Sequence, residues 1–166
     1  MPARAVRHFA LVITTVALTA CLDTTAPLPD SGVPAALELS IGGFGGHSSA
    51  LALRGDTIVM YRVPWDYVPG RVIDTVRVVP TAEAWRAFWA AANTAGVNRW
   101  HSEYRADEIM DGLGWNLRLA TGNREITSWG SNAYPDNSGA AHKGEMTTEF
   151  RAFLTALDQL VGQSFY

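Results

Sequence analysis

The 166-residue chain is predicted to fold as an α+β domain, an antiparallel sheet of five to six strands with two helices packed on one face. Three observations predict this class. Apolar and polar residues alternate in several short runs, tight-turn residues separate these runs, and two segments repeat apolar residues at helical spacing. The order is three or four strands, a helix, two strands and a helix. The domain is expected to span residues 36–166.

The first strands are expected where apolar and polar residues alternate, over residues 37–41, 51–53, 58–63 and 72–78. A glycine cluster at 42–46 separates the first two. The dipeptide Gly55-Asp56 predicts a two-residue hairpin turn, since glycine supplies the positive φ that such a turn needs.

Both expected helices have an apolar stripe, and flanking residues mark their ends. Thr81 is the expected N-cap of the first and Gly96 closes it, while Gly162 ends the last helix. The stripe residues are Trp85, Phe88, Trp89 and Ala92 in the first helix, and Phe150, Phe153, Leu154, Leu157 and Val161 in the last.

Between the helices, a second hairpin is expected from strands over 115–119 and 125–129 joined by a Gly122-Asn123 turn. Residues 97–105 fit no single element. Residues 130–144 are expected to be irregular.

The first 20 residues are typical of a secretion signal. Arg4 and Arg7 precede an apolar run over residues 9–18, which is too short to cross a bilayer as a helix. The run ends in Leu18-Thr19-Ala20-Cys21, which resembles the lipobox of bacterial lipoproteins. The resemblance implies that lipid is attached to the Cys21 sulfur, that the chain is cleaved before Cys21, and that its new amino group is acylated. An ordinary signal peptide with a chance cysteine is the alternative.

The lipobox resemblance also implies an address. Two or three acyl chains would anchor the chain stably in a membrane of the bacterial cell envelope, with palmitate as a typical acyl group. Leu22 follows the cysteine where aspartate would retain an enterobacterial lipoprotein in the inner membrane, which favours the outer membrane.

Residues 22–35 are rich in proline, threonine and small side chains, so residues 21–35 are predicted to be the lipidated cysteine and a flexible tether. Fully stretched, such a tether reaches on the order of 45 Å, which would let the domain stand clear of the membrane.

Composition excludes several classes of function. Cys21 is the single cysteine, so the domain has no disulfide, no cysteine-based zinc site and no cysteine nucleophile. Removal of Arg4 and Arg7 with the signal leaves 11 basic residues against 16 acidic ones, without a basic cluster. This balance argues against a nucleic-acid partner. No phosphate-binding loop or metal signature occurs, and no cofactor is predicted.

Three motif-like stretches are better explained by structure than by chemistry. Residues 46–50 lack the final glycine of a hydrolase nucleophile elbow around Ser48. Arg54-Gly55-Asp56 matches an adhesion tripeptide but is accounted for by a hairpin turn. Residues 107–112 place Ile109 where a calcium loop needs an acid.

The segment Trp129-Gly130-Ser131-Asn132-Ala133-Tyr134-Pro135, with Asp111-Gly112 and Trp115, resembles a sparsely characterised group of bacterial secreted and lipoprotein domains over residues 36–162. The resemblance implies an architecture and no activity. From the residues themselves, Trp129, Asn132 and Tyr134 form a candidate contact site, and Phe44 in the glycine cluster is a further contact element. The alternative is a turn that locks the sheet to the last helix.

Two classes of function remain. The first is a non-catalytic envelope module that binds an envelope protein or a cell-wall partner, for example as an inhibitor of a hydrolase. The second is a small envelope hydrolase that uses His101 or His142 with carboxylates such as Glu103 and Asp107.

A sugar-stacking surface made from Trp65, Trp100 and Trp129 is a variant of the first class. A pocket in which a histidine meets an acid would favour the enzyme, whereas an exposed aromatic patch would favour the binding module.

Overall fold

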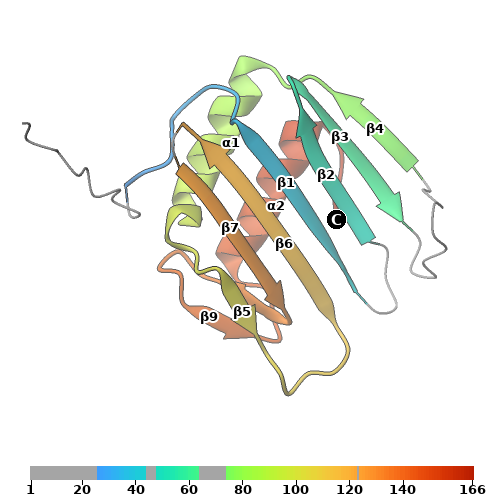
Figure 1. Cartoon of the computed structure of the whole chain (residues 1–166), viewed down its shortest axis with the longest axis vertical. Coiled ribbons are helices and arrows are strands. Elements are labelled where there is room, and N and C mark those ends of the chain that lie inside the picture. Colours follow the sequence, from blue (N-terminus) through green and yellow to red (C-terminus); the bar gives the residue numbers. More distant parts are fainter. Residues whose placement is uncertain (1–25, 44–47, 64–73, 123) are drawn as a thin grey trace, which may run out of the picture.

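The computed structural model describes residues 26–43, 48–63, 74–122 and 124–166. It confirms the α+β class and the two helices (Figure 1). The strands of the main sheet are β1 (Ala36–Gly43), β2 (Ser48–Arg54), β3 (Thr57–Val63), β4 (Asp74–Val78), β5 (Glu103–Arg105), β6 (Leu113–Thr121) and β7 (Arg124–Ser131). The helices are α1 (Ala82–Thr94), α2 (Thr148–Val161) and the 3-10 turn η1 (Val97–Arg99).

The main sheet has seven strands in the order β4-β3-β2-β1-β6-β7-β5. All neighbours are antiparallel except β5, which pairs with β7 in parallel. The expected count of five to six strands was therefore wrong. The strand that alternation misses is β5, which has three residues and is too short to show a period.

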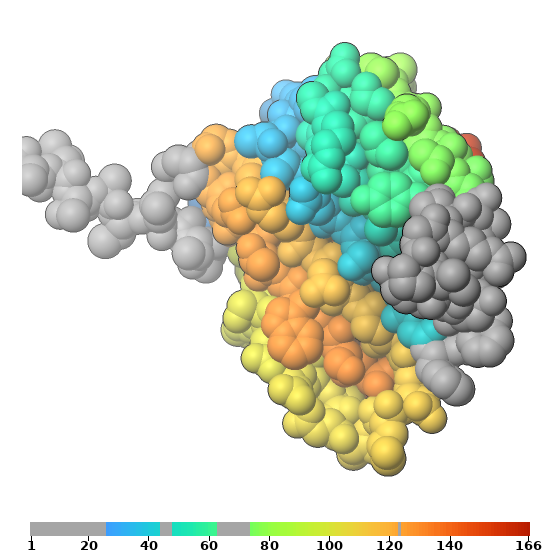
Figure 2. Space-filling view, turned by 45° about the vertical axis from the view of Figure 1, so that its right-hand side comes forward, coloured from blue at the N-terminus to red at the C-terminus, as the bar shows by residue number. Residues whose placement is uncertain are grey.

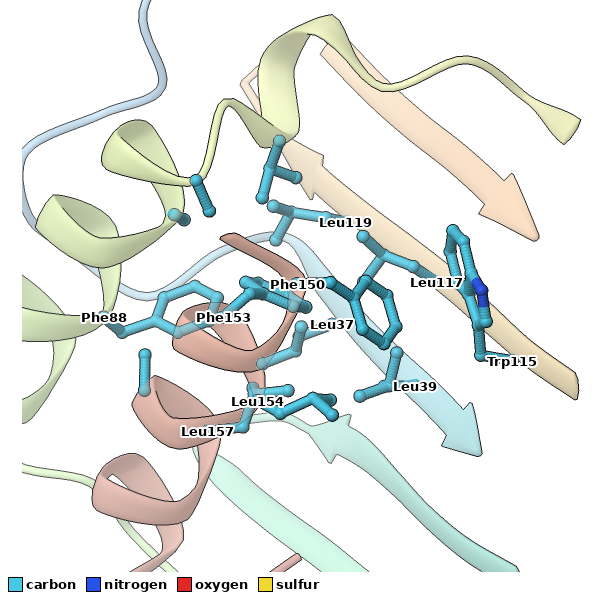
Figure 3. Packing of buried hydrophobic residues seen from close by; sticks show 14 of the residues in the cluster. Leu37, Leu39, Phe88, Trp115, Leu117, Leu119, Phe150, Phe153, Leu154 and Leu157 are labelled. Atoms are coloured by element: carbon cyan, nitrogen blue, oxygen red, sulfur yellow. The ribbon is translucent and has the colours of Figure 1, made fainter. Parts of the chain in front are cut away.

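Both helices cover one face of the sheet, where the strands present their apolar side chains (Figure 1). Every stripe residue predicted for α1 and α2 is buried. Figure 3 shows how Phe150 and Phe153 of α2 lie among leucines of β1 and β6. Phe88 of α1 reaches the same cluster, with its ring centroid 6.0 Å from that of Phe153. This layer is the core that keeps the sheet rigid.

The helix ends form as the sequence predicts. The Thr81 hydroxyl accepts a hydrogen bond from the Ala84 N–H at 3.1 Å, which caps α1. Gly162 takes a left-handed conformation at the end of α2, with φ of 74°. The predicted hairpin turn at Gly55-Asp56 joins β2 to β3.

Residues 130–144, which were expected to be irregular, form a second small sheet. Its strands are β8 (Ala133–Pro135) and β9 (Ala141–Lys143), paired antiparallel. The sequence hides this hairpin because each strand has three residues, below the length at which alternation can be recognised.

The predicted tether is largely fastened to the domain. Residues 26–35 run along α1, and Leu28 is buried there. Asn93 of α1 clamps the backbone of Leu28, accepting its N–H at 2.8 Å and donating to its carbonyl at 3.2 Å. The Trp89 indole N–H donates to the Gly32 carbonyl at 2.7 Å. We call residues 26–35 the strap. Residues 26–35 are therefore not a free tether.

The first described residue of the strap is also held. The Ala26 carbonyl accepts a hydrogen bond from the Asn98 side chain at 3.2 Å and another from the Arg124 guanidinium at 2.6 Å. Cys21 and the rest of residues 1–25 lie outside the described part of the chain. In the parts that the structure describes, no helix has the length and apolar character needed to cross a bilayer.

Candidate functional site

The face of the sheet opposite the helices carries a row of side chains that runs straight across five strands. Strand register aligns Tyr61 of β3, Ala50 of β2, Ser40 of β1, Asn116 of β6 and Trp129 of β7. Side chains at alternate positions of a strand share a face, so all five point away from the helices. The row has an aromatic ring at each end and small or polar groups between. We call it the cross-sheet row.

A groove lies over the centre of this row, because Ser40, Ala50 and Ala52 are too small to fill the space between the aromatic ends. Its volume is about 350 Å³, and its lining includes Tyr61 and Trp129. A second hollow of about 310 Å³ shares Tyr61 and the central residues of the row with it. In Figure 2 the blue residues of β1 lie between the green surface of β2 and β3 and the orange surface of β7.

Charged side chains beside the groove are matched in pairs. Arg54 lies 3.1 Å from Glu38, and the Arg118 guanidinium donates two hydrogen bonds to the Glu125 carboxylate at 2.9 and 3.1 Å. The hydrogen bonds from Arg118 hold the pKa of Glu125 below its usual range. Because each glutamate is paired with an arginine, these two pairs present guanidinium and carboxylate groups without an excess of either charge.

The indole of Trp129 is supported from the outer side of the sheet. The Arg105 guanidinium, on the edge strand β5, lies 5.8 Å from the ring centroid in a cation–π contact. Arg105 is itself held by Asp107 at 2.8 Å and Glu103 at 3.5 Å. Arg105 therefore covers one face of the indole, and Trp129 is also among the residues that line the groove.

The contact site predicted from Trp129, Asn132 and Tyr134 does not form on one surface. Trp129 is half-buried on the open face, whereas Asn132 and Tyr134 are only 7% and 2% exposed. The Asn132 side chain accepts from the Leu113 N–H and donates to the Ile109 carbonyl, so it ties two loops together. The Tyr134 ring packs 5.1 Å from that of Phe150 in α2. Tyr134 thus locks the sheet to the last helix, as the alternative expected, whereas Asn132 holds the chain that leads into β6.

The remaining residues predicted to make contacts are Phe44 and the three tryptophans considered for sugar stacking. Phe44 lies outside the described residues, as does Trp65. Trp100 is 7% exposed and packs among the aromatic rings of the core, so it contributes no sugar-stacking surface. Of the three tryptophans considered for such a surface, Trp129 is the one that the structure places on an open face.

Sequence reasoning missed Tyr61 as a site residue. It falls within the strand expected over residues 58–63, and nothing in that alternation distinguishes it as a contact residue. The signal that identifies it is strand register, which aligns it with Trp129 through three intervening strands, and register is a property of the folded sheet.

One histidine does meet an acid. The His142 Nε2 lies 3.0 Å from the Asp136 Oδ2 beside an open concavity of about 540 Å³. The other carboxylate oxygen, Oδ1, accepts from the Ser138 N–H and hydroxyl and from the Ala140 N–H. These bonds, with that of Ser138 as the largest cause, lower the pKa of Asp136 well below its ordinary value of 3.8. Asp136 is thus the anchor of the β8–β9 turn.

Among the described residues, Asp136 is the one side chain that His142 bonds. Within the described ranges, His142 bonds no hydroxyl that could act as a nucleophile. His101 packs against the Tyr104 ring at 6.1 Å, and no described carboxylate bonds it. Among the residues whose placement is described, no cluster of three histidine, cysteine or acidic side chains is arranged to hold a metal ion.

Comparison of the chain with protein-family models, with curated proteins and with solved structures gives no significant match.

Proposed function

We propose that the protein is a lipid-anchored module of the bacterial cell envelope that binds a partner through the open face of its sheet and does no chemistry itself. The single observation that carries this proposal is the cross-sheet row, which places two half-buried aromatic rings at either end of an open groove. Large aromatic side chains beside a groove, on a face that the described helices do not cover, are typical of recognition surfaces.

The architecture supports a binding role. Both helices and the core lie behind the sheet, so the open face is a rigid platform that would lose little entropy on binding. Inhibition of an envelope hydrolase is one form that such binding could take. The lipobox sequence supports the anchor, and Leu22 favours the outer membrane.

A second candidate is a hydrolase built around His142. The observation in its favour is the 3.0 Å approach of His142 to Asp136 at an open concavity. The hydrogen bonds that Asp136 makes within its own turn favour a structural role for the pair. A His142→Ala variant that abolished a hydrolytic activity of the purified chain would revive this candidate.

The binding role is tested by comparing what the protein captures from native envelopes. A component recovered with the native chain should be lost with Trp129→Ala and retained with Tyr166→Ala, which removes an exposed aromatic ring elsewhere. A component that is lost equally with both variants, or with neither, would contradict binding through the open face.

The anchor is tested separately. Labelled palmitate should be incorporated into the native chain and not into Cys21→Ser, and the variant should leave the membrane fraction. An unacylated amino terminus in a mass spectrum of the native protein would refute the anchor and leave the open-face site standing.

A further inference from the structure

We propose that the ligand of the cross-sheet row is an uncharged glycan chain that lies across the strands and stacks on Tyr61 and Trp129. This inference rests on the proposed binding function and names the chemical class of the partner. The row, its charges and the hydrogen bonding of the sheet carry the argument.

The length and shape of the row suit a linear polymer. Four strand spacings of about 4.8 Å separate β3 from β7, so the backbones at Tyr61 and Trp129 lie about 19 Å apart. The floor between them consists of Ala50, Ser40 and Asn116, with Asn116 Nδ2 3.4 Å from the Ser40 hydroxyl. A chain of pyranose rings, whose C–H faces can pack on aromatic side chains, would lie on this low floor and meet an aromatic surface at both ends.

The polar groups of the face suit hydroxyls. Asn116, Arg118 and Glu38 present planar amide, guanidinium and carboxylate groups at the edge of the groove, each able to bond two adjacent hydroxyls. The arginines and acids already bonded in pairs keep further donor and acceptor positions, since a guanidinium has five N–H groups and a carboxylate several lone pairs.

An extended peptide fits this face less well. The backbone N–H and C=O groups of the central strands bond to neighbouring strands on both sides, so none is available for strand addition on the face. The backbone of a bound peptide would then rely on a few side chains for its many donors and acceptors. A glycan carries its polar groups at the rim of each ring and satisfies this arrangement more readily.

The charge balance selects an uncharged polymer. Glu38 with Arg54 and Glu125 with Arg118 cancel locally, so these two pairs add no net charge that would attract a polyanion or a polycation. Binding of the proposed ligand should therefore depend little on ionic strength, because screening acts on net charge interactions.

The test uses the full chain in a detergent without a sugar headgroup and measures binding of chitotetraose, cellotetraose and maltotetraose by calorimetry at millimolar ligand. At least one should bind the native chain. Trp129→Ala and Tyr61→Ala should each weaken that binding by about tenfold, since each removes one stacking surface. Tyr166→Ala is the matched aromatic control and should bind as the native chain does.

Three further measurements serve as controls: a Trp129→Phe variant, added salt and a charged oligosaccharide. Trp129→Phe retains a ring, so it should recover part of the affinity lost in Trp129→Ala even if truncation disturbs β7. Affinity should be unchanged by added salt, and a tetragalacturonate should bind more weakly than the uncharged sugars. The absence of binding by all three uncharged sugars would overturn the glycan assignment.

Two outcomes separate this inference from the proposed function. A protein captured from envelopes through Trp129 and Tyr61, with no oligosaccharide bound, would overturn the glycan and leave the binding module standing. If the native chain bound neither an oligosaccharide nor an envelope component, both the glycan assignment and the binding function would be overturned.

Discussion

At the residue scale, Gly130 packs tightly against the Trp115 indole. A Cβ on Gly130 would lie 2.2 Å from the Trp115 Nε1 and 2.6 Å from the Ala133 carbonyl oxygen. That nitrogen donates to the same carbonyl at 3.0 Å. Glycine is required because a side chain would occupy the place of this buried hydrogen bond.

Gly130→Ala should therefore destabilise the protein by about 2 kcal/mol or more, through overpacking and loss of the Trp115 hydrogen bond. Urea denaturation followed by circular dichroism measures this change. Gly114→Ala is the matched control on the neighbouring strand, where a Cβ meets nothing closer than 3.8 Å. Equal destabilisation by both substitutions would show that the Trp115 contact is not the cause.

A second prediction at this scale concerns the pH dependence of stability. Folding lowers the pKa of Asp136 from 3.8, so its carboxylate stabilises the fold above that value and the stabilisation is lost as the pH falls below it. The difference in urea midpoint between the native chain and Asp136→Asn should be widest above about pH 5 and should narrow progressively as the pH falls below 3.8. A difference that stays constant over this range would contradict the role assigned to the carboxylate.

At the scale of elements, the strap is the feature that a composition-based reading misjudges. Proline and threonine favour an irregular chain, and the strap is irregular, but Asn93 and Trp89 supply the hydrogen bonds that its backbone needs. Both partners lie on α1, more than 50 residues away in sequence. No local pattern in residues 26–35 announces such contacts.

Asn93→Ala should release the strap, because it removes both bonds to the Leu28 backbone and leaves those groups without a partner. Limited proteolysis should then cleave within residues 26–35 faster than in the native protein. Thr94→Ala, an exposed change on the same helix, should leave the cleavage rate unaltered. A strap that stays protected in Asn93→Ala would mean that Leu28 packing and the bonds to Gly32 and Ala26 are enough to hold it.

At the scale of the whole molecule, the sequence predicts the layers better than the surface. Alternation and helical stripes identify which side chains turn inward, since burial of Leu37, Phe88 or Phe150 leaves a periodic trace. The order of the strands leaves no such trace. Tyr61 and Trp129 face one groove because β1 sits between β2 and β6 in the centre of the sheet, and that arrangement depends on long-range pairing.

The same distinction explains the misplaced site residues. Asn132 and Tyr134 occur in a turn-like segment, which suggested exposure. The small β8–β9 sheet and α2 bury them, and neither covering element is evident from the turn itself. Polar and aromatic residues in a turn therefore predict function poorly until their neighbours in space are known.

If Cys21 carries the proposed lipid, the fastening of Ala26 to Asn98 and Arg124 would limit the distance between the domain and the bilayer. A lipid on Cys21 would be joined to the first fixed residue by five peptide steps, a leash of roughly 17 Å at full stretch. The end of the domain that holds Ala26, with Asn98 of η1 and Arg124 of β7, would then be the end nearest the membrane. Such a protein would meet partners that lie close to the membrane surface.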